Sequence, residues 1–158
     1  MDMTRNRLIA KFGITFIGIC SFLIGGFNKV EGAEWKLFQA TSTGNIYYFD
    51  STSIKHLPND FVRVVVRIIE TTGLSKEELN GLKDPKKTKD VIQKAQERST
   101  GEWKQVFEIN CSQGMFRVSQ ATLYDRNGNI KDDYEIPSEW LSIPPNSVTN
   151  YLRKMICP

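Results

Sequence analysis

The segment Phe61–Glu70, with the sequence FVRVVVRIIE, is the most strongly patterned part of the chain. Its even-numbered positions form one wholly apolar face, made of Val62, Val64, Val66 and Ile68. The odd-numbered positions place two arginines among apolar residues: Phe61, Arg63, Val65, Arg67 and Ile69. Because successive side chains of a strand point to opposite faces of a sheet, this alternation predicts a β-strand whose even-numbered face meets the core.

Further strands are predicted on both sides of this segment. Trp35–Thr41 and Asn45–Asp50 are separated by a short polar turn, Ser42-Thr43-Gly44, which is typical of a hairpin. Downstream, the alternation resumes at Trp103 and places a set of apolar residues on one side: Trp103, Phe107, Ile109 and Cys111. Met115–Tyr124, a turn at Asp125–Asn129 and a returning strand at Ile130–Glu135 follow. The pattern predicts an antiparallel sheet of about six strands.

The C-terminal segment changes to helical spacing. After Pro144 and Pro145, either Asn146 or Ser147 can cap a helix. Apolar residues then recur at i, i+3, i+4, i+7 and i+8, namely Val148, Tyr151, Leu152, Met155 and Ile156. We expect this stripe to pack on one face of the sheet, which makes the fold class α+β.

The cysteines indicate how that helix is held. Cys157 follows the predicted helix, and Cys111 ends a strand on the core-facing side, so the two sulfurs could form a disulfide. Two free buried thiols are the alternative. The third cysteine, Cys20, lies in the apolar N-terminal segment and is either discarded with it or lipidated.

The N-terminus has the order of a secretory signal. Arg5, Arg7 and Lys11 precede an apolar run of 16 residues, positions 12–27, after which the chain becomes polar. We expect cleavage after Gly32 or Ala33, leaving residues 33–158 as the mature domain in the periplasm or on the surface of a bacterium. An uncleaved membrane anchor remains an alternative, although this run is slightly short for a bilayer span.

Residues 71–101 interrupt the β pattern and predict a helical insertion. Ser75 and Glu78 have the spacing of a capping box, and Asp84 followed by Pro85 resembles a helix start. The second helix has only a narrow apolar stripe, so we expect it to lie loosely on the surface. A basic cluster that could meet an acidic partner or a lipid headgroup surface lies near its start: Lys83, Lys86, Lys87 and Lys89.

Residue clusters that would support catalysis or metal binding are weak. His56 is the only histidine and lies in a predicted exposed loop. Asp125, Asn127 and Asn129 resemble the start of a calcium loop, but Ile130 and Ile136 stand where glycine and glutamate are required, so a plain turn is favoured. We therefore predict no catalytic residue, no metal and no cofactor.

Composition argues against nucleic acid as a partner. The chain has 21 basic and 18 acidic residues, of which four and two lie in the first 32 positions, so the remainder has a net charge of about +1. Binding to a phosphate backbone needs a concentrated basic face. A charge this close to zero favours other partners.

The order of several short motifs resembles the surface-adhesin protein E family. Trp35 opens a strand, residues 47–50 read YYFD, and EINC stands at residues 108–111. The remaining matching positions are Ser53, Ile54, Val62, Arg63, Val64, Trp140, Ile143, Pro145, Ser147 and Cys157. The resemblance implies an antiparallel sheet with a disulfide-tethered C-terminal helix, and a role in adhesion to host extracellular matrix.

These observations favour an exported, non-enzymatic, adhesin-like binding module. Its expected partner is a protein or an envelope or matrix component, with no small-molecule substrate. A periplasmic structural or accessory protein of an envelope assembly is the alternative. A hydrolase that uses Asp132, Asp133 and Glu135 is a third class, against which a solvated edge strand is favoured. The candidate partner-binding residues are Arg63, Arg67, Lys83, Lys86, Lys87 and Lys89.

Overall fold

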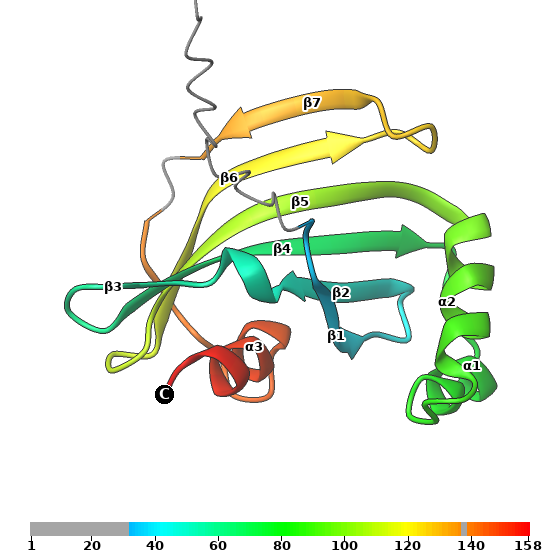
Figure 1. Cartoon of the computed structure of the whole chain (residues 1–158), viewed down its shortest axis with the longest axis horizontal. Coiled ribbons are helices and arrows are strands. Elements are labelled where there is room, and N and C mark those ends of the chain that lie inside the picture. The colour runs from blue at the N-terminus through cyan, green and yellow to red at the C-terminus, as the bar shows by residue number, and fades with distance from the viewer. Residues whose placement is uncertain (1–31, 137–138) are drawn as a thin grey trace, which may run out of the picture. The chain divides into compact units, whose positions relative to one another are not determined.

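Strand β4 (Phe61–Thr71) lies in the middle of one antiparallel sheet in the computed structural model, which describes residues 32–136 and 139–158 (Figure 1). The strand order is β1-β2-β4-β5-β6-β7, so neighbours along this path are also consecutive in sequence except β2 and β4, between which β3 lies in the chain. Their bounds are β1 Trp35–Ala40, β2 Asn45–Asp50, β5 Ser99–Asn110, β6 Met115–Tyr124 and β7 Ile130–Glu135. The predicted α+β class and its six strands are therefore confirmed.

Two short strands were not predicted. β3 (Lys55–Leu57) follows the one-turn helix η1 (Ser51–Ser53) and pairs with the start of β4, while β8 (Leu141–Ser142) pairs with β6. His56 lies exposed in β3, so its exposure is confirmed but its placement in a loop is wrong. Three residues are too few to show a period of two, which is why pattern alone cannot detect such strands.

Helix α3 (Val148–Ile156) packs on the even-numbered face of β4 and forms the first core. Ser147 caps the helix, since its hydroxyl accepts a hydrogen bond from the backbone N–H of Asn150. Leu152 and Ile156 are buried among residues of β2, β4 and β5: Phe49, Val62, Val64, Val66, Ile68, Phe107 and Ile109. This confirms the predicted core-facing side of the central strand.

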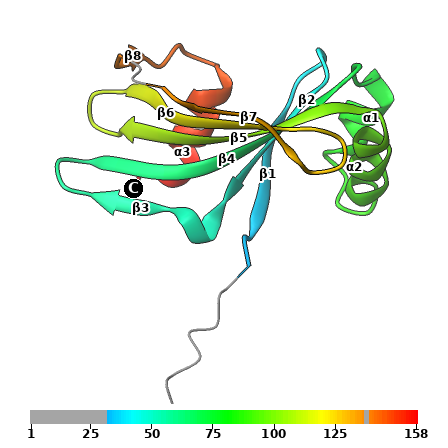
Figure 2. The same ribbon diagram turned by 90° about the horizontal axis from the view of Figure 1, so that it is seen from above.

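The apolar stripe of α3 is only partly buried, which corrects the expectation that all five residues pack on the sheet. Tyr151 is 40% exposed and Met155 is 53% exposed. Figures 1 and 2 show α3 near one end of the sheet, with α1 and α2 at the other end. A nine-residue helix that covers only part of a twisted sheet leaves one flank of its stripe in solvent.

A second core lies on the opposite face of the sheet. Helices α1 (Lys76–Gly81) and α2 (Thr88–Glu97) lie in the predicted insertion between β4 and β5, but its predicted ends, Thr71 and residues 99–101, belong to these two strands. The buried residues of this core are Ile46, Tyr48, Ile69, Leu74 and Ala95. The expectation that α2 lies loosely on the surface is therefore wrong, because its Val91 and Ala95 are buried. The helical pair is anchored on the sheet.

The start of α2 also differs from the prediction. The capping box of Ser75 and Glu78 opens α1 as expected. Asp84, however, closes a turn by accepting a hydrogen bond from the backbone N–H of Lys86 at 3.0 Å, and α2 begins at Thr88. The predicted N-cap is thus a turn residue, because short polar side chains satisfy turn backbones as readily as helix ends.

One glycine is required where the insertion leaves the sheet. Gly44 has a φ of +108°, and a Cβ at this position would lie 2.4 Å from the carbonyl oxygen of Thr71. The same Thr71 donates hydrogen bonds from its N–H and its hydroxyl to the carbonyl of Gly44, at 3.0 and 2.8 Å. The β1–β2 turn is therefore fixed against the end of β4.

The predicted disulfide joins Cys111 to Cys157 with a Cα–Cα distance of 5.7 Å, so free thiols are excluded at these positions. The guanidinium of Arg153 on α3 also donates two hydrogen bonds to the carbonyl of Cys111, at 2.6 and 3.2 Å. The helix end is thus held covalently and by hydrogen bonds. Within the described residues, no helix is both long and apolar enough to cross a membrane.

Candidate partner-binding surfaces

Arg63 lies in a ladder of charged residues across three strands. It is the register partner of Glu108 on β5, which in turn faces Arg117 on β6. The Nε of Arg63 donates to Oε1 of Glu108 at 2.9 Å, and the Nε of Arg117 donates to Oε2 at 2.7 Å. Glu108 therefore has one arginine on each carboxylate oxygen, and its own side chain is only 7% exposed.

Aromatic side chains cover one end of this ladder. The guanidinium carbon of Arg117 lies 4.8 Å from the ring centroid of Trp140, and that ring lies 5.1 Å from the ring of Phe61. Burial alone would raise the pKa of Glu108, but the hydrogen bonds and charges of the two arginines outweigh it and hold the pKa below its ordinary value. Arg63 is thus a paired residue whose side chain remains 47% exposed.

Substituting Glu108→Gln is expected to lower the free energy of unfolding at pH 7 by about 1–3 kcal/mol, because two charge-assisted pairs are lost at partly exposed arginines. The folded-state pKa of Glu108 lies below its unfolded value. Its contribution is therefore present above the unfolded pKa and is lost as the pH falls through the folded pKa. Urea denaturation between about pH 7 and pH 3 should show the variant and wild type converging at the acid end.

Glu135→Gln on the exposed strand β7 is the matched control. It should change the stability by less than about 0.5 kcal/mol at every pH. A deficit of Glu108→Gln that stayed constant across the whole pH range would contradict an ionised, arginine-bound carboxylate.

Arg67 lies on the same face of β4 but is more enclosed. Its Nη2 contacts Oε2 of Glu102 at 2.6 Å, and its guanidinium carbon lies 5.8 and 6.0 Å from the rings of Trp35 and Tyr48. Burial raises the pKa of Tyr48 to about 12, although the charge of Arg67 acts in the opposite direction. The side chain of Arg67 therefore mainly contacts residues of the sheet itself.

The lysine cluster differs from the two arginines. Lys83 lies in the turn after α1, Lys86 and Lys87 lie in the turn before α2, and Lys89 lies in its first turn. All four residues are exposed, and no ion pair joins any of them to a carboxylate in the described part of the chain. The four lysines thus lie on the connection between β4 and β5, whereas Arg63 and Arg67 lie in β4 itself.

A groove that the sequence did not reveal runs between β1 and α1. Its volume is about 480 Å³. Its principal lining residues are Leu37, Phe38 and Ala40 from β1 together with Leu79, Leu82 and Lys83 from the helical insertion. Strand β1 is the first in the sheet order, so the groove follows an edge of the sheet.

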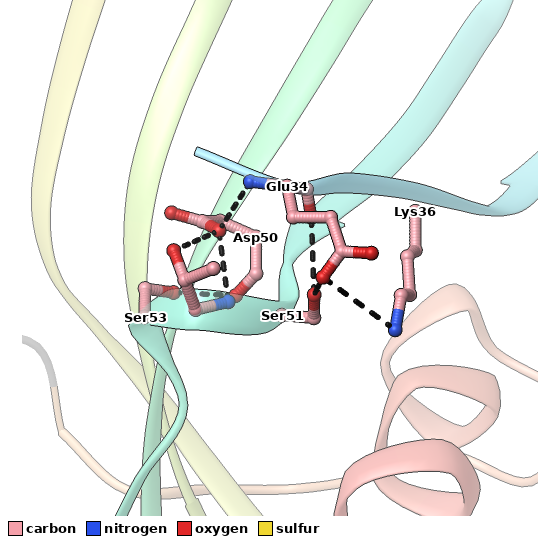
Figure 3. A network of polar contacts seen from close by, with 6 residues as sticks. Glu34, Lys36, Asp50, Ser51 and Ser53 are labelled. Carbon is pink, nitrogen blue, oxygen red and sulfur yellow. Dashed lines mark hydrogen bonds and ion pairs between the residues drawn. The ribbon is translucent and has the colours of Figure 1, made fainter. Parts of the chain in front are cut away.

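The start of β1 is fastened by a polar network (Figure 3). The buried carboxylate of Asp50 accepts hydrogen bonds from the N–H of Glu34 at 3.0 Å and from the N–H and hydroxyl of Thr52. Ser51 donates to the carboxylate of Glu34 at 2.6 Å. The backbone of Glu34, directly after the proposed cleavage positions, is thus held by Asp50.

Cleavage after Gly32 or Ala33 stays a prediction, as do the domain boundaries at residues 32 and 33. Both residues are exposed. The predicted signal peptide up to residue 31 and Cys20 lie outside the described residues.

The other polar motifs have structural partners. The carboxylate of Asp125 accepts from the N–H groups of Asn127 and Asn129, and the bond from Asn129 is the main reason that its pKa lies below the ordinary value. The turn interpretation is therefore confirmed. On β7, Asp133 accepts from Thr122 at 2.7 Å and Asp132 accepts from Tyr134. In the described segments, no group of three or more histidine, cysteine or acidic residues could hold a metal ion.

Two of three comparisons with known proteins give matches. The crystal structure of Haemophilus influenzae protein E in its selenomethionine form shares 17% sequence identity, with 80% of this chain and 92% of that chain covered and a TM-score of 0.44. Crystal form II of the same protein shares 15% identity, with 80% and 95% covered and a TM-score of 0.43. No curated protein matches at a significant level. The model of a family described as surface-adhesin protein E matches residues 35–158, and the chain belongs to this family.

Proposed function

We propose that the protein is an exported, non-enzymatic binding module that holds a macromolecular partner at or near the cell surface. Membership of a surface-adhesin family supports an adhesin-like role. The observation that carries the proposal is the lysine cluster, which is exposed and has no carboxylate partner among the residues described. An acidic region of a protein or of an envelope or matrix component fits this surface.

The placement of these lysines supports a binding surface rather than a merely solvated loop. They project from a connection that is packed on the sheet through Leu74, which precedes α1, and through Ala95 of α2. A charged surface on a fixed support loses less conformational entropy on binding than one on a mobile segment. The lysine cluster is therefore the principal contact in this proposal, with Arg63 and Arg67 as secondary candidates.

The test is a fourfold substitution to glutamine at Lys83, Lys86, Lys87 and Lys89. The exported protein would be titrated onto immobilised basement-membrane extract and, separately, onto immobilised cell-envelope extract. For one of these two extracts, we expect the protein concentration needed for half-maximal binding to rise about tenfold in the variant. Wild-type binding should also weaken with added salt, because salt screens exposed charges.

The matched control removes the same number of charges elsewhere, with glutamine at Lys55, Lys76, Lys94 and Lys131, which are all exposed. Equal losses in both variants would point to net charge alone and would overturn the placement. Unchanged binding in the lysine-cluster variant would overturn it as well. Labelling of intact cells with a membrane-impermeant reagent separates surface display from the alternative, a periplasmic accessory role.

A further inference from the structure

Strand β1 has one unpaired side. It pairs with β2, and no other described strand pairs with it. The carbonyl of Ala40 accepts a long hydrogen bond, 3.4 Å, from the side-chain amide of the neighbouring Gln39. An edge of this kind presents backbone N–H and C=O groups that can take up an added strand.

The groove beside this edge is suited to alternate side chains of such a strand. Leu37 and Ala40 from β1 and Leu79 and Leu82 from the helical insertion line it, and all four are half-buried. Successive side chains of an extended peptide point to opposite sides. When a peptide pairs with β1, every second side chain can therefore enter an apolar groove between the strand and α1.

The charge around the groove selects one class of peptide. Lys83 is the only charged residue in its lining, and the other three lysines of the cluster follow it along the chain. Glu78 on α1 is neutralised by Arg98, whose Nη2 lies 2.7 Å from its carboxylate. The Nζ of Lys36 on β1 lies 3.9 Å from Oε2 of Glu34, so the charges of these two side chains offset each other. The charge that Lys83 gives the groove lining is positive and favours acidic side chains.

We infer that this groove binds an extended segment of a partner protein, in which apolar residues alternate with acidic ones, by adding it as a strand to the free edge of β1. The backbone of β1 supplies the pairing, the groove receives the apolar side chains and the lysine cluster meets the acidic ones. A bulge between Leu37 and Gln39 interrupts the edge, so the added segment is short. This inference names the partner segment for the proposed function and rests on it.

The first experiment defines the peptide class. The exported protein would be used to select binders from a displayed library of random ten-residue peptides, and the enriched peptides would be measured by fluorescence anisotropy. We expect enrichment of peptides with acidic residues and with apolar residues at every second position. Failure to enrich any peptide, or enrichment of basic or irregular peptides, would overturn the inference.

The second experiment tests strand addition directly. The strongest peptide would be resynthesised with a single N-methyl group at each position in turn. In a β-ladder only every second N–H of an edge strand faces its neighbour. Methylation should therefore weaken binding about tenfold at alternate positions and leave the positions between them unaffected. A uniform effect, or none, would overturn pairing with β1.

The third experiment places the peptide in this groove. Lys83→Glu should lower the affinity for the acidic peptide about tenfold. A peptide with lysine in place of its acidic residues should bind this variant with restored affinity. Lys94→Glu, an exposed change on α2 outside the groove lining, is the matched control and should leave both peptides unaffected. Equal effects of the two substitutions would overturn the location.

The results separate this inference from the proposed function. If the fourfold lysine variant loses binding to the extracts while the N-methyl scan shows no alternation, the binding role stands and strand addition fails. If peptides pair with β1 while the fourfold variant keeps full binding to the extracts, the lysine surface fails as the main contact. A dimer in sedimentation analysis that dissociates in Lys83→Glu and excludes peptide would assign the edge to a second copy and overturn the inference.

Discussion

Replacing both cysteines, as Cys111→Ser with Cys157→Ser, is expected to lower the free energy of unfolding by about 2–5 kcal/mol. The bond closes a loop with a sequence separation of 46 residues, so its removal increases the conformational entropy of the unfolded chain. Single domains have a total stability of about 5–15 kcal/mol. The loss would therefore be a large share of the total.

Urea denaturation followed by circular dichroism measures this loss. Wild-type protein reduced with dithiothreitol should unfold at nearly the same urea concentration as the double variant, because both lack the same constraint. Ser112→Ala, next to Cys111 and exposed, controls for local changes of the β5–β6 turn. A double variant as stable as the oxidised wild type would contradict the expectation that the disulfide stabilises the fold by restricting the conformations of the unfolded chain.

Leu152→Ala should destabilise the protein by about 2–5 kcal/mol, because it removes a large side chain from a fully buried position and leaves a cavity. Leu152 has no exposed surface and belongs to the first core, where α3 meets β4 and β5. Thermal or urea unfolding of the oxidised protein would measure the effect, with the disulfide intact so that α3 stays tethered.

Met155→Ala tests the same helix without a core defect. Met155 lies in α3 and is 53% exposed, so its truncation should change the stability by less than about 0.5 kcal/mol. Both substitutions introduce the same good helix former, and the difference between them isolates packing. Equal losses at the two positions would mean that the core contact of α3 is not what Leu152 supplies.

The strands and the terminal helix could be predicted because their signals are local. Four even-numbered residues of β4 are apolar and all of them are buried in the first core. Ser75 and Glu78 form the predicted capping box because that motif needs only a spacing of three residues. The disulfide was predictable as well, since Cys111 ends a core-facing strand and Cys157 follows an amphipathic helix.

The second core could not be predicted, because it depends on how a connection folds back. Ile69 lies on the face of β4 that carries the arginines, yet it is buried where α2 covers that face. The apolar stripe of α2 contains few residues. Periodicity alone does not show that Ile46 and Tyr48 on the sheet belong to the same core.

The candidate site was only partly predictable for the same reason. The lysines could be grouped because they lie within seven residues of each other. The partners of the arginines are distant in sequence, since Glu108 is 45 residues from Arg63 and Glu102 is 35 residues from Arg67. Register decides these pairs, and the sequence pattern does not define register across a connection of unknown shape.

The helical pair occupies the tip of one hairpin, between β4 and β5, which pair directly along their whole length. Changes in the length or charge of such a tip need not shift the pairing of the strands beneath it, and the entropy cost of a longer connection rises slowly. The lysines and one wall of the groove can therefore diversify during evolution while the scaffold is retained, provided that the few apolar residues facing Ile46 and Ile69 are kept. If the lysines and the groove bind a partner as proposed, recognition and folding are in this way under largely separate selection.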